Sequence, residues 1–172
     1  MTTGSRLRLA TVWLSGCSGC HMSLLDLDEW LFVLADLAEI VYSPVASDCK
    51  IYPPQVDVCL VEGAVANRDN LELALQLRAR TSRVIALGDC AALGNVTALR
   101  NLCGAGVQHS AWEALDCAYR QLSDGEEVIP AAPILLPRVL PLHRVIAVDG
   151  VIPGCPPTAA AIRAALETLL QP

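Results

Sequence analysis

The sequence lacks long apolar runs, and this absence excludes one class of protein. No uninterrupted apolar run approaches the roughly 18 residues that a membrane-spanning helix requires. An export signal is missing as well, because residues 1–5 are largely polar and the apolar stretch at residues 9–14 is too short for the core of a signal peptide. The chain also has no twin-arginine pair. We therefore expect a cytoplasmic protein with no membrane span.

Charged residues are scarce too. They make up 17% of the chain, below the usual quarter, while hydrophobic residues make up 53% and the mean hydropathy is +0.45. The formal net charge of −6 argues against nucleic acid as a partner, because the phosphate backbone attracts basic proteins. The simplest interpretation is a soluble domain that hides much of its surface against a partner protein.

Apolar runs alternate with segments of helical periodicity. Strands are expected at residues 8–14, 39–42, 56–61, 83–87 and 145–148. Helices are expected at residues 22–37, 67–80, 110–122 and 157–170, and at least in part at 91–100. Strands that alternate with helices form a parallel sheet with right-handed crossovers. We predict one α/β domain over residues 1–172, with a flavodoxin-like, doubly wound, parallel five-stranded sheet in the order 2-1-3-4-5.

One segment interrupts this alternation. Residues 123–143 carry four prolines among apolar residues: Pro130, Pro133, Pro137 and Pro141. Because proline cannot donate a backbone hydrogen bond, this segment is expected to form neither a helix nor a central strand. We interpret it as a packed irregular excursion or as part of an interface.

The chain has eight cysteines, and four of them follow predicted strands. Cys17 and Cys20 form a Cys-Ser-Gly-Cys motif after the first strand. Cys90 follows the fourth strand in Leu-Gly-Asp-Cys, and Cys155 follows the fifth in Ile-Pro-Gly-Cys-Pro-Pro. Because functional groups collect at the carboxyl ends of parallel strands, we expect these four thiols at one edge of the sheet. In a reducing compartment they are more plausible as metal ligands or catalytic thiols than as disulfides.

Three chemistries can use such an arrangement. A single Cys-x-x-Cys pair at a helix start is typical of a redox dithiol, and four thiolates also suit zinc, although zinc ribbons usually supply them as two Cys-x-x-Cys knuckles. An iron–sulfur cluster explains more, because glycines beside the cysteines let the backbone approach closely and donate N–H groups to cluster sulfurs. We favour the cluster and keep zinc and the dithiol as alternatives.

The other four cysteines have mostly structural interpretations. Cys59 lies within a predicted strand and Cys117 within a predicted helix, so both are expected in the core. Cys49 and Cys103 lie in loops, and each can replace one of the four chosen ligands. Glu62 ends the third strand at the same sheet edge, where it serves either as a functional carboxylate or as a cap for the next helix.

Three stretches of the sequence, at residues 17–26, 88–91 and 148–157, resemble the small subunit of [NiFe] hydrogenases, most closely the cytosolic bidirectional NAD-reducing type. The resemblance runs from about residue 7 to about residue 170. Its most specific part is Pro-Gly-Cys-Pro-Pro combined with the amino-terminal Cys-x-Gly-Cys. The proximal [4Fe-4S] ligands of the family map onto the four cysteines already chosen, Cys17, Cys20, Cys90 and Cys155.

The resemblance implies an electron-transfer small subunit of a soluble [NiFe] hydrogenase, an H2:NAD+ oxidoreductase. One [4Fe-4S] cluster would relay electrons between a Ni–Fe centre in the large subunit and a diaphorase module that carries flavin and iron–sulfur centres. FMN beside the cluster is a weaker implication. The chain has no P-loop, no G-x-G-x-x-G and no nucleophile–base triad, so no independent activity is expected. The alternative is a free flavodoxin-like FMN carrier, although the loop at residues 15–20 lacks the Ser/Thr-rich phosphate cradle of flavodoxins.

The chain departs from its relatives in three places. Periplasmic relatives continue into a carboxyl-terminal domain with two more clusters, whereas this chain ends at Pro172, which implies one cluster. Those relatives often place a glutamate just before the first cysteine, where this chain has Gly16, so a proton route through that glutamate is absent or rerouted. The sister subunit of respiratory complex I carries adjacent cysteines at its first ligand site, which the motif at residues 17–20 lacks.

Overall fold

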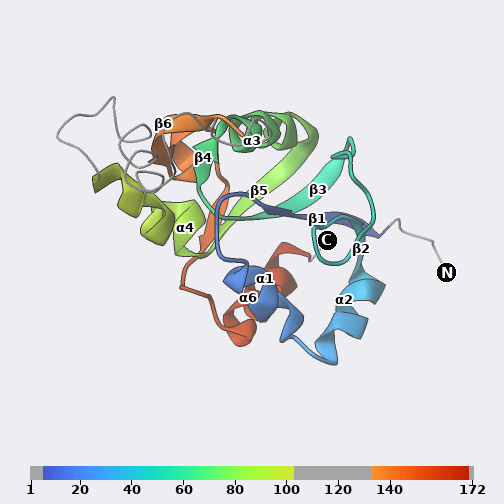
Figure 1. The fold of residues 1–172 in the computed structure, drawn as a ribbon. Helices are drawn as coiled ribbons and strands as arrows, with labels where there is room; N and C mark the ends of the chain where they lie inside the picture. The colour runs from blue at the N-terminus through green and yellow to red at the C-terminus, as the bar shows by residue number, and fades with distance from the viewer. Residues whose placement is uncertain (1–5, 103–132, 171–172) are drawn as a thin grey trace.

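The fold is built around a parallel sheet of five strands (Figure 1). The structure is a computed structural model that describes residues 6–102 and 133–170. In chain order the elements are β1 (Leu7–Trp13), α1 (Gly19–Leu25), α2 (Trp30–Leu37), β2 (Ala38–Tyr42), β3 (Val56–Glu62), β4 (Val65–Asn67), α3 (Arg68–Arg80), β5 (Thr81–Leu87), α4 (Gly88–Leu93), the 3-10 helix η1 (Asn95–Leu102), β6 (Leu135–Leu140), the 3-10 turn η2 (Leu142–Arg144), β7 (Gly150–Ile152) and α6 (Ala159–Leu169).

The central sheet has the order β2-β1-β3-β5-β7 with every pair parallel, which confirms the predicted flavodoxin-like 2-1-3-4-5 arrangement. Four residues that stand in register across the sheet mark its carboxyl edge, namely Trp13, Glu62, Leu87 and Ile152. The cysteine-bearing loops begin directly after three of these positions. The register of the sheet therefore sends the three loops out at the same edge.

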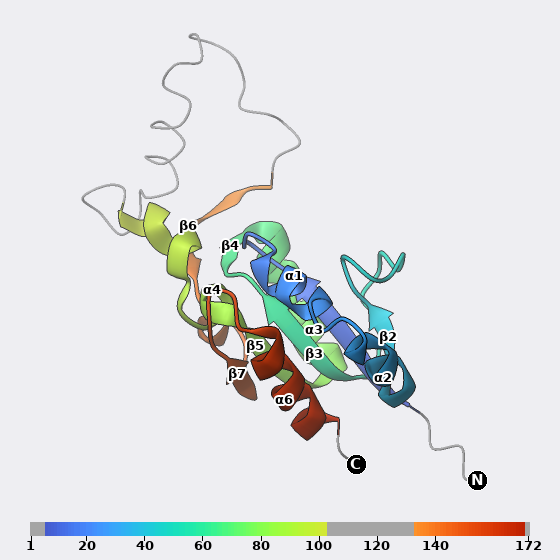
Figure 2. The ribbon, with the colours of Figure 1, turned by 90° about the horizontal axis from the view of Figure 1, so that it is seen from below.

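Helices cover both faces of the sheet. Helices α1, α2 and α6 cover one face, which Figure 2 shows from the helix side, and α3 covers the other. Alternate residues of β3 enter the two layers of core. Val58 and Leu60 pack under α1, α2 and α6, whereas Cys59 and Val61 pack on the side of α3 and α4. Burial on both faces explains why β3 is a nearly continuous apolar run.

Most of the predicted elements occur within a few residues of their expected bounds, but the predicted helix at residues 22–37 is wrong as a single element. It forms two helices, because α1 ends at Leu25 and α2 begins at Trp30. Asp28 between them has a φ of 49°, in the left-handed region, which interrupts the helical path. The backbone N–H of Trp30 donates to the carbonyl of Leu27 at 3.0 Å and closes the turn. The apolar spacing continues through this break, so the pattern did not reveal it.

The predicted fifth strand at residues 145–148 is also wrong. The fifth strand is β7, at Gly150–Ile152. The backbone N–H of Ile146 instead donates to the carbonyl of Leu142 at 3.0 Å in a tight turn, and both side chains are buried in the core on the α4 side of the sheet. These apolar residues pack in the core, and the residues that pair with β5 are those of β7.

The proline-rich segment contains one strand that was not predicted. β6 pairs antiparallel with β4 in a separate two-stranded ribbon, outside the central sheet as expected, and includes Pro137. A two-stranded ribbon tolerates proline, because one side of each strand makes no hydrogen bonds to a partner strand and the missing N–H can lie on that side. The predicted helix at residues 110–122 lies outside the described residues. Within the part of the chain that the structure describes, no helix is both long enough and apolar enough to cross a bilayer.

Candidate metal centre

Three loops at the carboxyl edge of the sheet carry the four candidate ligands. Cys17 and Cys20 lie between β1 and the first turn of α1, Cys90 lies in α4, and Cys155 lies between β7 and α6. Cys20 and Cys90 are buried, with 7% of each exposed, whereas Cys17 and Cys155 are exposed. The group therefore has an inner pair that faces the protein and an outer pair that faces its surroundings.

Hydrogen bonds join the Cys90 loop to the Cys155 loop directly. The backbone N–H of Asp89 donates to the carbonyl of Gly154 at 2.9 Å, and the N–H of Gly154 donates to the Asp89 carboxylate at 2.8 Å. The hydroxyl of Ser23 on α1 donates to the carbonyl of Pro157 at 2.5 Å, which ties the Cys17–Cys20 loop to the same place. All three loops are thus cross-linked to each other as well as to the sheet.

A glycine at the start of α4 makes room for one sulfur. Gly88 has a φ of 81°, and a Cβ built on it would lie 2.3 Å from the sulfur of Cys20. That distance is far below van der Waals contact, so the Cys20 thiol occupies the space that any other residue at position 88 would fill. The Cys20 sulfur therefore lies against the same turn that presents Cys90.

The other three candidate cysteines also act on the Cys20 thiol electrostatically. Burial, followed by the negative charges of Glu62, Cys90, Cys17 and Cys155, raises the pKa of the Cys20 thiol to about 12. Thiolates this close repel one another unless a cation compensates their charge. Metal ligands bind as thiolates, so loading such a site releases protons.

The donor set of four thiols suits an iron–sulfur cluster and also suits zinc. Zn–S bonds of about 2.3 Å in a tetrahedron bring four sulfurs to about 3.8 Å from one another. Among the described residues, no group of three or more His, Cys, Asp or Glu side chains is arranged to hold a metal ion. A cluster is bulkier and keeps its thiolates farther apart, which suits four cysteines that converge from three loops.

Glu62 is a cap, but for a different helix from the one expected. Its carboxylate is 1% exposed and accepts hydrogen bonds from the backbone N–H groups of Cys20 at 3.4 Å and His21 at 2.9 Å. It also pairs with Nδ1 of the fully buried His21 imidazole. These N–H groups belong to the first turn of α1, whereas α3 is capped by Asn67. Glu62 therefore anchors the helix that carries Cys20 to the middle of the sheet edge.

Two of the other cysteines lie in the described part of the chain. Cys59 is fully buried in β3, where burial raises its pKa to about 12, so its predicted core position is confirmed. Cys49 is exposed, and its thiol donates to the carbonyl of Ile51 at 3.1 Å within its own loop. Cys103 and Cys117 lie outside the described residues.

Sequence reasoning did not predict the contacts that three residues of the site make: His21, Asp89 and Asn95. His21 pairs with a residue 41 positions away, and Asp89 bonds to one 65 positions away, so no local pattern carried either signal. The side-chain amide of Asn95 lies 3.2 Å from the Cys155 sulfur and is likewise separated from it by 60 positions. For Asn95, the only available hint was its position: it is a polar residue two positions after the end of the helix that carries Cys90.

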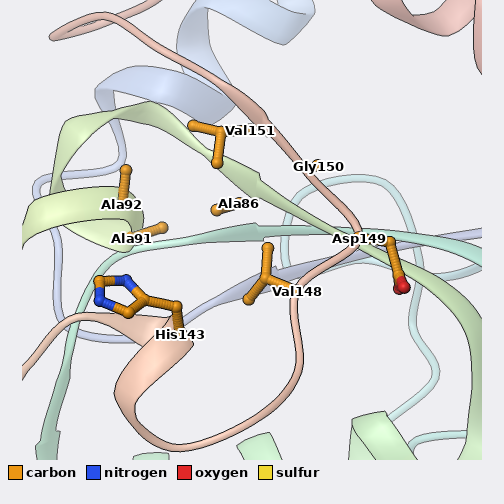
Figure 3. Close-up of a pocket in the computed structure, with 8 residues that line it drawn as sticks. All are labelled: Ala86, Ala91, Ala92, His143, Val148, Asp149, Gly150 and Val151. Atoms are coloured by element: carbon orange, nitrogen blue, oxygen red, sulfur yellow. The ribbon is translucent and has the colours of Figure 1, made fainter.

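A cavity of about 250 Å³ lies beside the cysteine loops but contains none of the four cysteines (Figure 3). It is lined by Ala86, Ala91, Ala92, His143, Val148, Asp149, Gly150 and Val151. Figure 3 shows His143 at one end and Asp149 at the other, with aliphatic side chains between them. A flavin phosphate is often held by hydroxyl groups, and none of the eight lining residues carries one, so the cavity gives the FMN alternative no support.

The family described as "NADH ubiquinone oxidoreductase, 20 Kd subunit" matches residues 17–169. A subunit of the F420-non-reducing hydrogenase of Methanothermobacter thermautotrophicus is 37% identical over 174 residues, which cover 96% of this chain and 54% of that protein. NAD-reducing hydrogenase HoxS subunit delta of Cupriavidus necator is 31% identical over 176 residues, which cover 96% of this chain and 79% of that one. The chain spans about half the length of the F420-non-reducing relatives that it matches.

Solved structures give the same picture. A chain in the crystal structure of NAD+-reducing [NiFe]-hydrogenase in the H2-reduced state superposes with a TM-score of 0.85 at 36% identity, over 96% of this chain and 91% of that one. The [NiFeSe] hydrogenase of Desulfovibrio vulgaris Hildenborough superposes with a TM-score of 0.58 at 16% identity, over 96% of this chain and 59% of that one, and shows a shared fold.

Proposed function

Because this chain belongs to the family of the NADH ubiquinone oxidoreductase 20 Kd subunit, within which it is related to hydrogenase subunits, we propose that it is the electron-transfer small subunit of a [NiFe] hydrogenase. The Ni–Fe centre belongs to a large-subunit partner in this proposal. The relatives named above, including the NAD-reducing HoxS subunit delta, support this assignment. The activity is a property of the complex, and the chain supplies a path for electrons.

The proposed path is one [4Fe-4S] cluster bound by Cys17, Cys20, Cys90 and Cys155. The observation that carries it is the direct cross-link between the Cys90 and Cys155 loops, with the Cys20 sulfur lying against the start of α4. When bound, such a cluster accepts and donates single electrons. No other residue need change its bonding during transfer. The protein holds the four thiolates in place, limits the access of water to the inner pair and leaves the outer pair at the surface.

The burial pattern suggests how the chain meets its partners. Cys17 and Cys155 are on the exposed side of the group, so electrons would enter or leave there. The proposed complex passes electrons from H2 through this chain to a flavin- and iron–sulfur-bearing diaphorase module and on to NAD+, in the cytoplasm. The support for NAD+ is the close structural match to a chain of an NAD+-reducing hydrogenase over nearly its whole length. The six cysteines of the described residues are all free thiols, which suits a reducing compartment.

A cysteine series tests the ligand assignment. In the complex, single changes of Cys17, Cys20, Cys90 or Cys155 to alanine should either abolish the EPR signal of this cluster, with the loss of about four iron and four sulfide atoms, or convert the signal, with the loss of about one iron atom. Cys49→Ala is the matched control, because Cys49 is also exposed and bonds within its own loop. Loss of the same signal in the Cys49 variant, or its survival unchanged in the Cys90 variant, would reassign the ligands.

A turnover assay tests the wider function. The complex should reduce NAD+ with H2, whereas the isolated chain should show no H2 uptake. Activity of the isolated chain would contradict the division of labour between the subunits. If the complex reduces artificial dyes with H2 but does not reduce NAD+, the assignment as a hydrogenase subunit would stand and the relay to a diaphorase module would be rejected.

A further inference from the structure

One polar side chain contacts a candidate ligand sulfur directly. Nδ2 of Asn95 lies 3.2 Å from the sulfur of Cys155, within hydrogen-bond range for sulfur. A metal-bound thiolate has no proton and can only accept, so toward a bound cluster the amide must present its N–H group. Among the described residues, this is the only side chain for which a hydrogen bond to one of the four ligand sulfurs is observed.

The backbone around Asn95 is held in an unusual conformation that aims this amide. α4 ends at Leu93; the next residue, Gly94, has a φ of 90°, and Asn95 follows with a φ of 39°. A non-glycine residue in the left-handed region is strained, and asparagine is among the few that adopt it readily. The two left-handed residues turn the chain sharply from α4 into η1. This turn places the Asn95 side chain over the Cys155 loop, 60 positions further along the chain.

A hydrogen bond to a ligand sulfur acts on the redox equilibrium of a cluster. It withdraws negative charge from the sulfur and so stabilises the reduced cluster, which carries one more electron. Cys155 belongs to the exposed pair, where water would otherwise hydrate the sulfur with changing geometry. A fixed donor at this position replaces that variable hydration when a partner covers the edge.

We propose that Asn95 is a positioning residue that sets the reduction potential of the cluster, by donating its side-chain N–H to the Cys155 sulfur and holding the potential higher than it would be without this bond. The inference rests on the proposed function, because it assumes a cluster on the four cysteines. It adds a residue that binds no metal and that the ligand motifs do not include.

Two substitutions separate the hydrogen bond from the backbone conformation. Asn95→Gly removes the amide and tolerates the positive φ, and Asn95→Asp keeps the shape while replacing the donor with a charged acceptor. Asn101→Asp is the charge control, since it adds the same charge six residues along η1, roughly 12 Å away at a 3-10 rise of about 2 Å per residue. Asn101 bonds to Val139 in β6 and not to a cysteine.

The measurement is an EPR-monitored redox titration of the purified complex, with iron counted first. We expect Asn95→Gly to lower the equilibrium constant for reduction of this cluster about threefold to tenfold, and Asn95→Asp to lower it further; tenfold corresponds to about 59 mV for one electron. Asn101→Asp should change it much less than Asn95→Asp does.

The outcomes separate this inference from the proposed function. A wild-type complex without a cluster on this chain would reject the function itself. A cluster with the same potential in the wild type and both Asn95 variants would overturn the inference and leave the function intact. Loss of the cluster from both Asn95 variants would also overturn it, because Asn95 would then be required for assembly and not for tuning. A shift in Asn101→Asp as large as in Asn95→Asp, together with no shift in Asn95→Gly, would assign the effect to charge alone and overturn the inference.

Discussion

Gly88→Ala tests whether the site needs the space at the start of α4 that the Cys20 sulfur occupies. The added Cβ would lie 2.3 Å from that sulfur, whereas carbon and sulfur pack at about 3.5–4.0 Å, so the sulfur must move by more than about 1 Å. Metal sites hold ligand distances to within about 0.2 Å. The left-handed backbone of Gly88 adds about 1–2 kcal/mol, and overpacking adds about 1–3 kcal/mol. We expect a loss of roughly 2–5 kcal/mol in stability.

The assay counts iron and acid-labile sulfide per complex and follows urea unfolding. Gly88→Ala should lose about four iron atoms and unfold at lower urea. Gly150→Ala in β7 is the matched control, because its new Cβ would meet only the tip of the Ile85 side chain at 3.1 Å and its φ is not in the left-handed region. This control should keep its iron. A Gly88→Ala complex with full iron content and an unchanged urea midpoint would refute the argument that position 88 shapes the site.

Three further predictions concern the surroundings of the site. Glu62→Gln should lower the free energy of unfolding by about 1.5–3 kcal/mol in urea titrations, since the buried charged acceptor of α1 becomes neutral; an unchanged free energy would reject the anchoring role. The pKa of Asp149 is held below its ordinary value of 3.8 by the Val84 N–H and by Arg78, so wild type should exceed Asp149→Asn in urea midpoint above about pH 4, and this advantage should fade as the pH falls further. An advantage that grows at low pH would contradict the sign. Leu99→Asp should weaken co-purification with the large subunit, because Leu99 is 59% exposed on η1 beside the cysteine edge; undiminished co-purification would move that interface elsewhere.

The sheet order and the meeting of the cysteine loops could be predicted because their signals are local. Strands β1, β2, β3 and β5 of the central sheet are short apolar runs that alternate with helices. Cys17 and Cys20 follow β1 closely and Cys90 follows β5, so this alternation was enough to predict that they lie at the carboxyl edge of the sheet. Cys155 was placed correctly even though its strand was not. The error at residues 145–148 arose because a run of buried apolar residues has the same composition whether it fills a core layer or joins a sheet.

The contacts that hold the site together could not be predicted in the same way. The pairing of Glu62 with His21 and of Asp89 with Gly154 depends on segments 41 and 65 positions apart that become neighbours only in the fold. The break at Asp28 depends on a single left-handed residue inside an otherwise helical pattern. Composition and periodicity predict which side of a helix or strand is buried, whereas these features depend on individual side chains and dihedral angles.

The three ligand loops are short, and this limits how far the site can move. Cys17 comes four residues after the end of β1, and Cys90 and Cys155 come three residues after the ends of β5 and β7. At about 3.3–3.6 Å per residue, even fully extended tethers keep each Cα within about 15 Å of the sheet, and the bonds between loops shorten that reach further. A centre held on such short tethers relaxes little when its charge changes by one electron. The energy barrier to electron transfer that arises from rearranging the protein should therefore be small, so the transfer rate would depend mainly on the distance to the next centre.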